Sequence, residues 1–284
     1  MTNTFTIVTP SYNQGSVLEE TILSVLSQQG NFHIEYIIAD GGSTDQSVEI
    51  IKKYDKLLKK NGFPIKCRGI EFRWWSKKDN GEAAAVNEGF RNARGDILAW
   101  ISSDDFYESN ALNIVLKRFQ EDNTVILVHG DAYHYYSKNK KILARSIETN
   151  FDDLLNKGNV ISVPSVFFTK KALTEAGPLD ENLHITDLDL WLRLAKIGKI
   201  SYVPHILGNF RVWKNSRSIY LHDKFGTKER KKLLKRYGGR RIDPKHIYKI
   251  KSKIKLIGYI KSSAPGLYIF IKKIFYKVLD AFRY

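Results

Sequence analysis

The chain of 284 residues is 43% hydrophobic and 12% aromatic, which is enough for one large α/β domain or for one domain with a sizeable extension. Its only cysteine, Cys67, excludes an intramolecular disulfide framework and is typical of a protein in a reducing cytosol. No opening apolar segment resembles a signal peptide, and no apolar run approaches the roughly 18 residues of a membrane-spanning helix. We therefore expect a cytoplasmic protein.

The formal net charge of +16 at pH 7 is concentrated at one end of the chain. Residues 201–284 contain 22 Lys and Arg against 4 Asp and Glu, a net charge of +18, whereas residues 1–200 carry −2. A solvated basic surface is one interpretation, but such an excess more often attracts anionic lipid or nucleic acid. The sequence thus predicts a near-neutral body followed by a basic extension.

The first half of the chain alternates strand and helix patterns. The β-branched run at 5–9 predicts a strand, the apolar spacing at 17–26 predicts a helix, and residues 35–39 predict a second strand. Helical spacing returns at 48–54, and the alternation continues to about residue 130. This order indicates βαβ units and a mostly parallel sheet flanked by helices.

Polar turns follow the predicted strands and contain candidate ligand-binding residues. The carboxyl ends of parallel strands meet at one edge of a sheet, where open α/β folds bind their ligands. Asp104 and Asp105 come just after an apolar strand at 97–101, and their mutual repulsion costs stability unless a cation or a hydrogen-bond donor neutralises it. A metal ion is the economical explanation for this pair.

The turn after the second strand offers a site for a flat ring. Asp40 can accept a hydrogen bond from an imide nitrogen, Tyr12 offers a face for stacking, and Gly41 and Gly42 allow close approach of the backbone. The alternative is that Asp40 only lies in a loop and caps the following helix.

The second half of the chain carries weaker signals. Residues 133–136 and 161–168 predict strands, and the apolar spacing at 186–197 predicts a helix. Two closing strands are expected at 200–203 and 208–213. Beyond these strands the sequence is basic and helical.

The last segment, at about 266–284, has an amphipathic helical pattern. Apolar and aromatic residues fill one half of the helix, and Lys and Arg lie among the residues of the other half. This pattern is typical of a helix that lies at an anionic membrane surface. Packing on the catalytic domain or on a second subunit of a homo-oligomer is the alternative, and no nucleic-acid-binding module is recognised.

Five motifs occur together in the first 217 residues: TPSYN at 9–13, DGGSTD at 40–45, DNGEAAAVNEG at 79–89, GDILAWISSDD at 95–105 and TDLDLWLRL at 186–194. In this order they resemble the family 2 glycosyltransferases of the GT-A fold. The resemblance covers roughly residues 5–217 and implies a Rossmann-like α/β catalytic domain at 1–217, with a basic helical extension at 218–284. It also implies transfer of a sugar from a nucleotide donor, with inversion at the anomeric carbon.

The resemblance implies a role for each matching residue of the donor site. Asp40 is expected to hold the nucleobase, with Pro10 and Tyr12 lining it, and Asp79 is expected to shape the nucleotide pocket. UDP is favoured by the resemblance and by the imide argument, although a thymidine nucleotide presents the same imide.

The segment Ser103-Asp104-Asp105 occupies the place of the family's DXD motif, with Ser103 at its first position. Asp104 is expected to face the ribose, and Asp105 to reach a divalent metal, Mn²⁺ or Mg²⁺, on the diphosphate. One or two protein carboxylates are sufficient because such cations take further ligands from substrate phosphates.

Asp187 matches the family's catalytic base, which takes the proton of the acceptor hydroxyl during attack. The alternative is that Asp187 favours the dipole of its helix and that Thr186 and Asp189 form a capping pair. We expect Asp189 to be structural. Trp213 stands where the family often has a histidine that completes the metal site.

We therefore expect a peripheral glycosyltransferase at the inner face of the cell membrane, which acts on a glycan or a lipid-linked acceptor in cell-surface polysaccharide or glycoconjugate synthesis. Trp213 motivates an alternative, a nucleotide-sugar-binding or assembly protein with impaired catalysis. A basic nucleic-acid-binding protein is the third interpretation, but it leaves Asp104, Asp105 and Asp187 without a role.

Overall fold

The computed structural model describes residues 3–157, 161–213 and 226–239. Residues Met1–Gly239 belong to one compact unit, and the predicted amphipathic helix at 266–284 lies outside the described residues. Among the residues that are described, no helix is long and apolar enough to cross a membrane.

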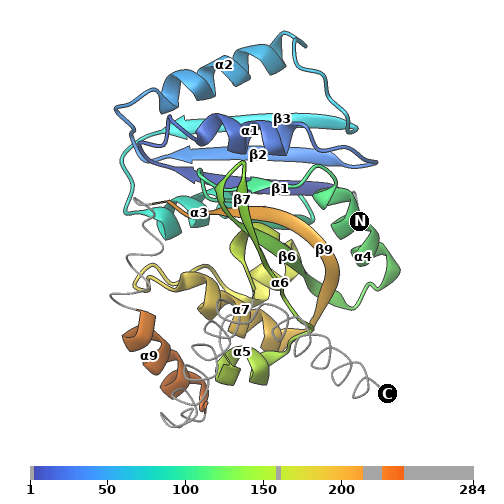
Figure 1. Ribbon diagram of the computed structural model, residues 1–284, viewed down its shortest axis with the longest axis vertical. Coiled ribbons are helices and arrows are strands. Elements are labelled where there is room, and N and C mark those ends of the chain that lie inside the picture. Colours follow the sequence, from blue (N-terminus) through green and yellow to red (C-terminus); the bar gives the residue numbers. More distant parts are fainter. Residues whose placement is uncertain (1–2, 158–160, 214–225, 240–284) are drawn as a thin grey trace, which may run out of the picture. The chain divides into compact units, whose positions relative to one another are not determined.

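One sheet organises the first unit (Figure 1). Its strands follow the order β3-β2-β1-β4-β8-β6-β9-β5, and β7 pairs with β6 outside this path. The strands are β1 (Thr4–Ser11), β2 (His33–Asp40), β3 (Gly69–Ser76), β4 (Ile97–Trp100), β5 (Phe106–Tyr107), β6 (Val125–Ser137), β7 (Lys140–Ala144), β8 (Val166–Thr169) and β9 (Lys199–Arg211).

Helices cover both faces of this sheet and connect its strands. They are α1 (Leu18–Leu26), α2 (Ser47–Lys59), α3 (Glu82–Arg91), α4 (Ala111–Glu121), α5 (Phe151–Lys157), α6 (Lys170–Ala176), α7 (Thr186–Ile197) and α9 (Thr227–Tyr237), together with the 3₁₀ turn η1 (Val163–Ser165).

The strands β3, β2, β1 and β4 form a parallel half-sheet, as the alternating pattern predicts. Every residue of β1 after Thr4 and every residue of β2 after His33 is buried. Strands buried on both faces are rich in apolar residues along their whole length, which explains the short apolar runs in the sequence. Ser11 at the end of β1 pairs with Asp40 at the end of β2, so the two polar turns begin side by side.

Two hydrophobic clusters lie on opposite faces of the sheet. Phe5 and Ile7 belong to the cluster that contains residues of α1, α2 and α4, whereas Val8 belongs to the one that contains residues of α3, α5, α6 and α7. The division follows the alternation of side chains along a strand. Leu233 of α9 is 1% exposed and belongs to the second cluster, so the compact unit extends beyond the predicted boundary at residue 217.

The second half of the sheet mixes strand directions: β8 runs antiparallel to β4 and β6, and β9 runs parallel to β6. The two predicted closing strands form one strand, β9, because register shifts around Asp131 of β6 accommodate the interruption at Pro204-His205. The strand predicted at 161–168 begins only at Val166. Pro164 belongs to the 3₁₀ turn before it and has no N–H to donate to a sheet.

Candidate functional site

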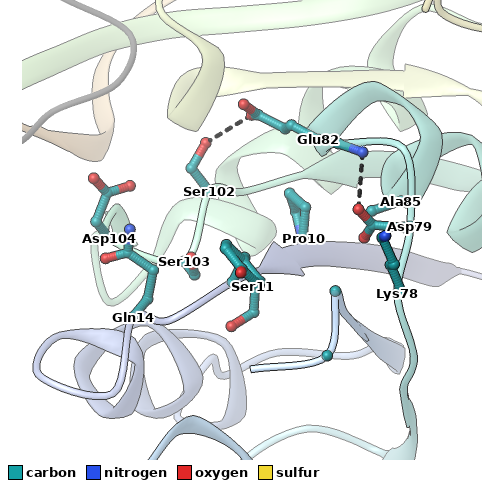
Figure 2. Close-up of a pocket in the computed structure, with 14 residues that line it drawn as sticks. Pro10, Ser11, Gln14, Lys78, Asp79, Glu82, Ala85, Ser102, Ser103 and Asp104 are labelled. Carbon is teal, nitrogen blue, oxygen red and sulfur yellow. Dashed lines mark hydrogen bonds between the residues drawn. The ribbon is translucent and has the colours of Figure 1, made fainter. Parts of the chain in front are cut away.

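A cavity of about 500 Å³ opens at the carboxyl edge of β1, β2 and β4. Four of the predicted donor-site residues, Pro10, Tyr12, Asp79 and Asp104, line it. Figure 2 shows Asp104 and Asp79 on opposite sides of the cavity, with Pro10 between them. The structure thus brings together residues from three segments that are far apart in the sequence.

Asp40 lies behind the cavity wall rather than in it. Its fully buried carboxylate accepts hydrogen bonds from the N–H groups of Gly42 and Ser43, at 3.1 and 2.9 Å. It also accepts hydrogen bonds from the hydroxyls of Ser43 and Ser76, at 2.5 and 2.6 Å. In this structure Asp40 holds the turn whose Gly41 and Gly42 line the cavity, which is the loop role weighed as the alternative. A contact between Asp40 and a nucleobase stays a prediction.

The turn at Gly42 requires glycine because its φ is +82°, in the left-handed region that side chains disfavour. Gly41 is constrained by packing instead: a Cβ added there would lie 3.0 Å from the Asp79 carboxylate. The nearest atom of that carboxylate is Oδ2, and its other oxygen, Oδ1, accepts a hydrogen bond of 2.8 Å from the N–H of Gly81, the residue before α3. Asp79 therefore packs the two turns against each other at the cavity wall.

The loop that carries Asp104 and Asp105 is fixed by α1 and by the end of β9. The hydroxyl of Thr21 donates to the carbonyl oxygens of Ser103 and Asp105, at 2.9 and 2.6 Å. The backbone N–H of Arg211 donates to the Asp105 carboxylate at 2.8 Å, and its Nε donates to the Asp104 carbonyl oxygen at 2.8 Å. The two carboxylates are thus held by contacts with distant parts of the chain.

The two carboxylates of this loop differ in exposure. Asp104 faces the cavity, and burial raises its pKa against the hydrogen bond from Trp213. Asp105 is only 1% exposed, and burial, together with the charge of Asp104, raises its pKa well above the ordinary value. Ionised, the pair concentrates negative charge that no Lys or Arg side chain neutralises by an ion pair among the described residues.

Trp213 reaches the same loop from beyond the end of β9. Its indole Nε1–H donates a hydrogen bond of 3.0 Å to Oδ2 of Asp104. Trp213 stands where the family often has a metal-binding histidine. It therefore acts as a hydrogen-bond donor to Asp104, the residue that is expected to contact the ribose and the metal.

Within the described ranges, no group of three or more His, Cys, Asp and Glu side chains is suited to hold a metal ion. Mg²⁺ is usually bound in proteins through one or two carboxylates plus substrate phosphates and water. The pair Asp104 and Asp105 beside the cavity, whose charge the nearby Arg211 offsets only in part, fits a cation of this kind, held mainly by a bound diphosphate.

Asp187 lies in the first turn of α7, half-buried, and is not among the residues that line the cavity. Asp189, two residues later, is 1% exposed and forms ion pairs with Arg193 at 2.9 Å and Arg236 at 3.1 Å. Tyr237 donates a third hydrogen bond to it at 2.9 Å. These contacts fit the expected structural role of Asp189, and the side chain of the N-cap residue of α7, Ile185, makes no capping hydrogen bond.

The motifs alone did not single out several cavity residues. Lys78 and Glu82 line the cavity on either side of the turn before α3, and Ser102 donates to Glu82 at 3.3 Å (Figure 2). Asn87 of α3 is 3% exposed and bonds Leu179 in the segment before α7, at 2.9 and 3.0 Å. Both Glu82 and Asn87 lie within the motif at 79–89. Nothing in that pattern distinguishes a residue that lines the cavity, such as Glu82, from one that connects two segments by hydrogen bonds, such as Asn87.

The family match to known proteins covers the part of the chain that contains the cavity residues. The family model described as Glycosyl transferase family 2 matches residues 6–176. An uncharacterized glycosyltransferase of Rickettsia conorii is 31% identical over 218 residues, which are 72% of this chain and 32% of that protein. The putative teichuronic acid biosynthesis glycosyltransferase TuaG of Bacillus subtilis is 28% identical over 219 residues, which are 75% of this chain and 80% of that protein. The chain spans 31% to 63% of the length of the rickettsial relatives that it matches.

Solved structures show the same fold. S. aureus TarS 1–349 in complex with UDP-GlcNAc has a TM-score of 0.58 at 15% identity, over 76% of this chain and 60% of TarS 1–349. The mannosyltransferase PcManGT from Pyrobaculum calidifontis, in complex with GDP-Man and Mn²⁺, has a TM-score of 0.55 at 14% identity, over 78% of this chain and 60% of its own. The predicted α/β fold of the GT-A type is confirmed.

Proposed function

The chain belongs to glycosyltransferase family 2, and on that premise we propose that it transfers a sugar from a nucleotide-diphosphate sugar to a hydroxyl of a glycan or lipid-linked acceptor. We assign this reaction to cell-surface polysaccharide or glycoconjugate synthesis, and the putative role of the Bacillus subtilis relative in teichuronic acid biosynthesis supports this assignment. UDP-sugars are the favoured donors and dTDP-sugars the second choice. The transfer inverts the anomeric carbon.

The observation that carries this proposal is the cavity at the sheet edge. Four separate segments of the region matched by the family model meet there, with Tyr12 61% exposed on one wall and Asp104 on another. A nucleotide needs an aromatic or glycine surface for its base and a site beside its phosphates where a cation can sit. The cavity offers both, and TarS, of the same fold, has been solved with UDP-GlcNAc.

Each predicted residue has a role in this proposal. Pro10 and Tyr12 hold the base, the turn shaped by Asp40 and Asp79 positions the nucleotide, and Asp104 reaches the ribose. Mn²⁺ or Mg²⁺, held by Asp105 and Asp104, would stabilise the negative charge of the departing diphosphate when bound.

Asp187 acts as the general base. An acceptor hydroxyl is a weak nucleophile until a carboxylate takes its proton during attack, and such proton transfer typically contributes 10²–10⁴-fold to a rate. Inversion follows because the hydroxyl attacks the face opposite the leaving diphosphate in a single displacement.

The membrane part of the proposal rests on charge. Residues 201–284 carry a net charge of +18. Among the described residues of this stretch, the exposed lysines all lie in α9: Lys228, Lys231, Lys232 and Lys235. Positive segments of this kind bind anionic lipid headgroups, each residue contributing about 1 kcal/mol near the surface. We propose that the protein lies at the cytoplasmic face of the membrane, with the amphipathic helix predicted at 266–284 as its contact.

A panel of nucleotide-sugars tests the donor proposal on the full-length protein. A thermal-shift screen with Mn²⁺ is expected to show stabilisation by one UDP- or dTDP-sugar and by the matching nucleoside diphosphate, reduced by EDTA. The purified protein should then slowly hydrolyse that donor in the presence of Mn²⁺. Binding without any turnover would favour the alternative of an impaired binding protein, which Trp213 on Asp104 motivates. Absence of any shift across the panel contradicts the proposal.

A further inference from the structure

Helix α7, which carries Asp187, begins without a cap of its own. Its N-cap residue is Ile185, whose side chain makes no capping hydrogen bond. The first N–H groups of a helix and those of the residues just before it have no partner within the helix, and an unsatisfied buried N–H costs about 1–3 kcal/mol. A capping pair of Thr186 and Asp189 is the alternative that the sequence offers, but in the structure a residue of another helix binds the N–H groups at this end of α7.

That group is Glu229 of α9, 44 residues further along the chain. Its carboxylate accepts hydrogen bonds from the backbone N–H groups of His184 at 2.8 Å and Ile185 at 3.0 Å. Its second oxygen contacts Nδ1 of His184 at 2.7 Å. Glu229 is 5% exposed. Burial pushes the pKa of Glu229 upward, but the hydrogen bonds from His184 and Ile185 outweigh it and hold the pKa below its ordinary value.

A second set of contacts joins the same two helices on the other side of Asp187. Arg236 of α9 pairs with Asp189 at 3.1 Å and with Asp180 at 3.3 Å. Tyr237 also donates to Asp189, at 2.9 Å. Helix α9 therefore holds α7 immediately before Asp187, at residues 184–185, and immediately after it, at residue 189.

We propose that α9 is a positioning element for the reaction, in which Glu229 caps α7 and, together with Arg236, fixes the turn that presents Asp187 to the acceptor. The inference rests on the proposed function of Asp187 as the base. Misplacement of a reacting group by about 1 Å can cost about 10²-fold in rate, so a turn without its cap presents the carboxylate poorly. Glu229 does not touch substrate in this proposal and acts only through α7.

The test compares kinetic constants of full-length variants at a temperature well below their melting temperatures. Glu229→Ala is expected to lower kcat about 10- to 100-fold and to leave the KM for the donor within about 2-fold, because the donor cavity includes no residue of α7 or α9. Glu229→Gln keeps one oxygen that can accept an N–H and should restore part of kcat. Glu175→Ala, which removes an exposed carboxylate of α6, should behave as the wild type.

A destabilised control separates positioning from a general loss of stability. Ile51→Val removes a buried methyl group on the opposite face of the sheet and should lower stability by about 1 kcal/mol without lowering kcat. Hydrogen exchange of the peptide 184–190 should accelerate in Glu229→Ala and stay unchanged in Ile51→Val. A wild-type kcat in Glu229→Ala, or an equal kcat loss in Ile51→Val, overturns the proposal.

Asp187→Asn in the same assay separates this inference from the proposed base. An inactive Asp187→Asn with a fully active Glu229→Ala overturns the role of α9 alone. A fully active Asp187→Asn overturns the base, and the positioning role falls with it.

Discussion

Two pairs of carboxylates, Asp187 with Asp189 in α7 and Asp104 with Asp105 beside the cavity, have opposite surroundings. Asp189 of the α7 pair is 1% exposed and has two arginine partners, Arg193 and Arg236. Asp105 of the cavity pair is equally buried, but its carboxylate accepts a backbone N–H from Arg211 and lies beside Asp104. A buried carboxylate that is paired with arginines is part of the scaffold, whereas burial and a neighbouring carboxylate raise the pKa of Asp105, so a bound cation would favour its ionised form.

The two pairs differ in the source of the positive charge that can balance them. At α7 the cations are supplied by the chain itself, and the helix is held in one position. At the cavity the chain supplies hydrogen-bond donors such as Trp213 but no ion pair to Asp104 or Asp105 among the described residues, so a bound cation would stabilise the loop.

Asp187→Asn is expected to have the largest effect. Loss of the base should lower kcat by 10²–10⁴-fold, and donor binding should stay near that of the wild type because Asp187 does not line the cavity. Transfer assays and donor titrations check this. The matched control is Glu49→Gln, which alters an exposed first-turn carboxylate of α2. Undiminished transfer by Asp187→Asn would remove Asp187 from the mechanism.

Asp189→Asn should follow as the largest effect on stability. Removal of the buried carboxylate leaves Arg193 and Arg236 without their acceptor charge, and because the Arg236 side chain is 50% exposed we expect a loss of about 2–3 kcal/mol. Urea unfolding of the full-length protein measures it. An unchanged midpoint would mean that Asp189 is not the structural partner of α9.

Asp105→Asn should act in the opposite direction when metal is absent. In EDTA at neutral pH the variant should be about 1 kcal/mol more stable than the wild type, because it removes a buried charge that repels Asp104. In Mn²⁺ with a nucleoside diphosphate the wild type should gain stability and the variant should gain little. Equal stabilisation of both proteins by Mn²⁺ would place the cation elsewhere.

The smallest effect is the pH dependence of the Glu229 contact. The pKa of Glu229 is held below its ordinary value, so its contribution to stability is present above about pH 5 and is lost as the pH falls through the lowered pKa. The stability difference between the wild type and Glu229→Gln should therefore shrink as the pH falls toward 3. A difference that grows on acidification would contradict the hydrogen bonding to the ionised carboxylate.

Much of the fold could be predicted from local pattern. The apolar strand runs and the helical spacing placed β1, β2, β4 and α7 nearly where they lie, because burial on two faces or on one stripe leaves a direct mark on the sequence. The strand β3 at Gly69–Ser76 was missed, since its mixed polar and aromatic residues give no clear period. Joining of the two closing strands into β9 was missed too, because Pro204 interrupts the pattern.

The candidate site divides in the same way. Turn residues such as Pro10, Tyr12 and Asp104 could be predicted to meet because parallel strands share one carboxyl edge. The burial of Asp40 behind the cavity wall could not be predicted, because it depends on a hydrogen bond from the hydroxyl of Ser76 on the neighbouring strand. Whether a carboxylate points into a cavity or into the protein is decided by side chains that lie far away in the sequence.

Local sequence patterns indicated most of the strands and helices, and the five motifs with their order along the chain indicated the family and the segments that form the cavity. The tertiary structure alone decided the state of each carboxylate. Arg236 compensates Asp189, Trp213 bonds Asp104, and Glu229 caps a helix 44 residues before it. Electrostatic energy depends on distance in space and on burial, and neither is set by distance along the chain.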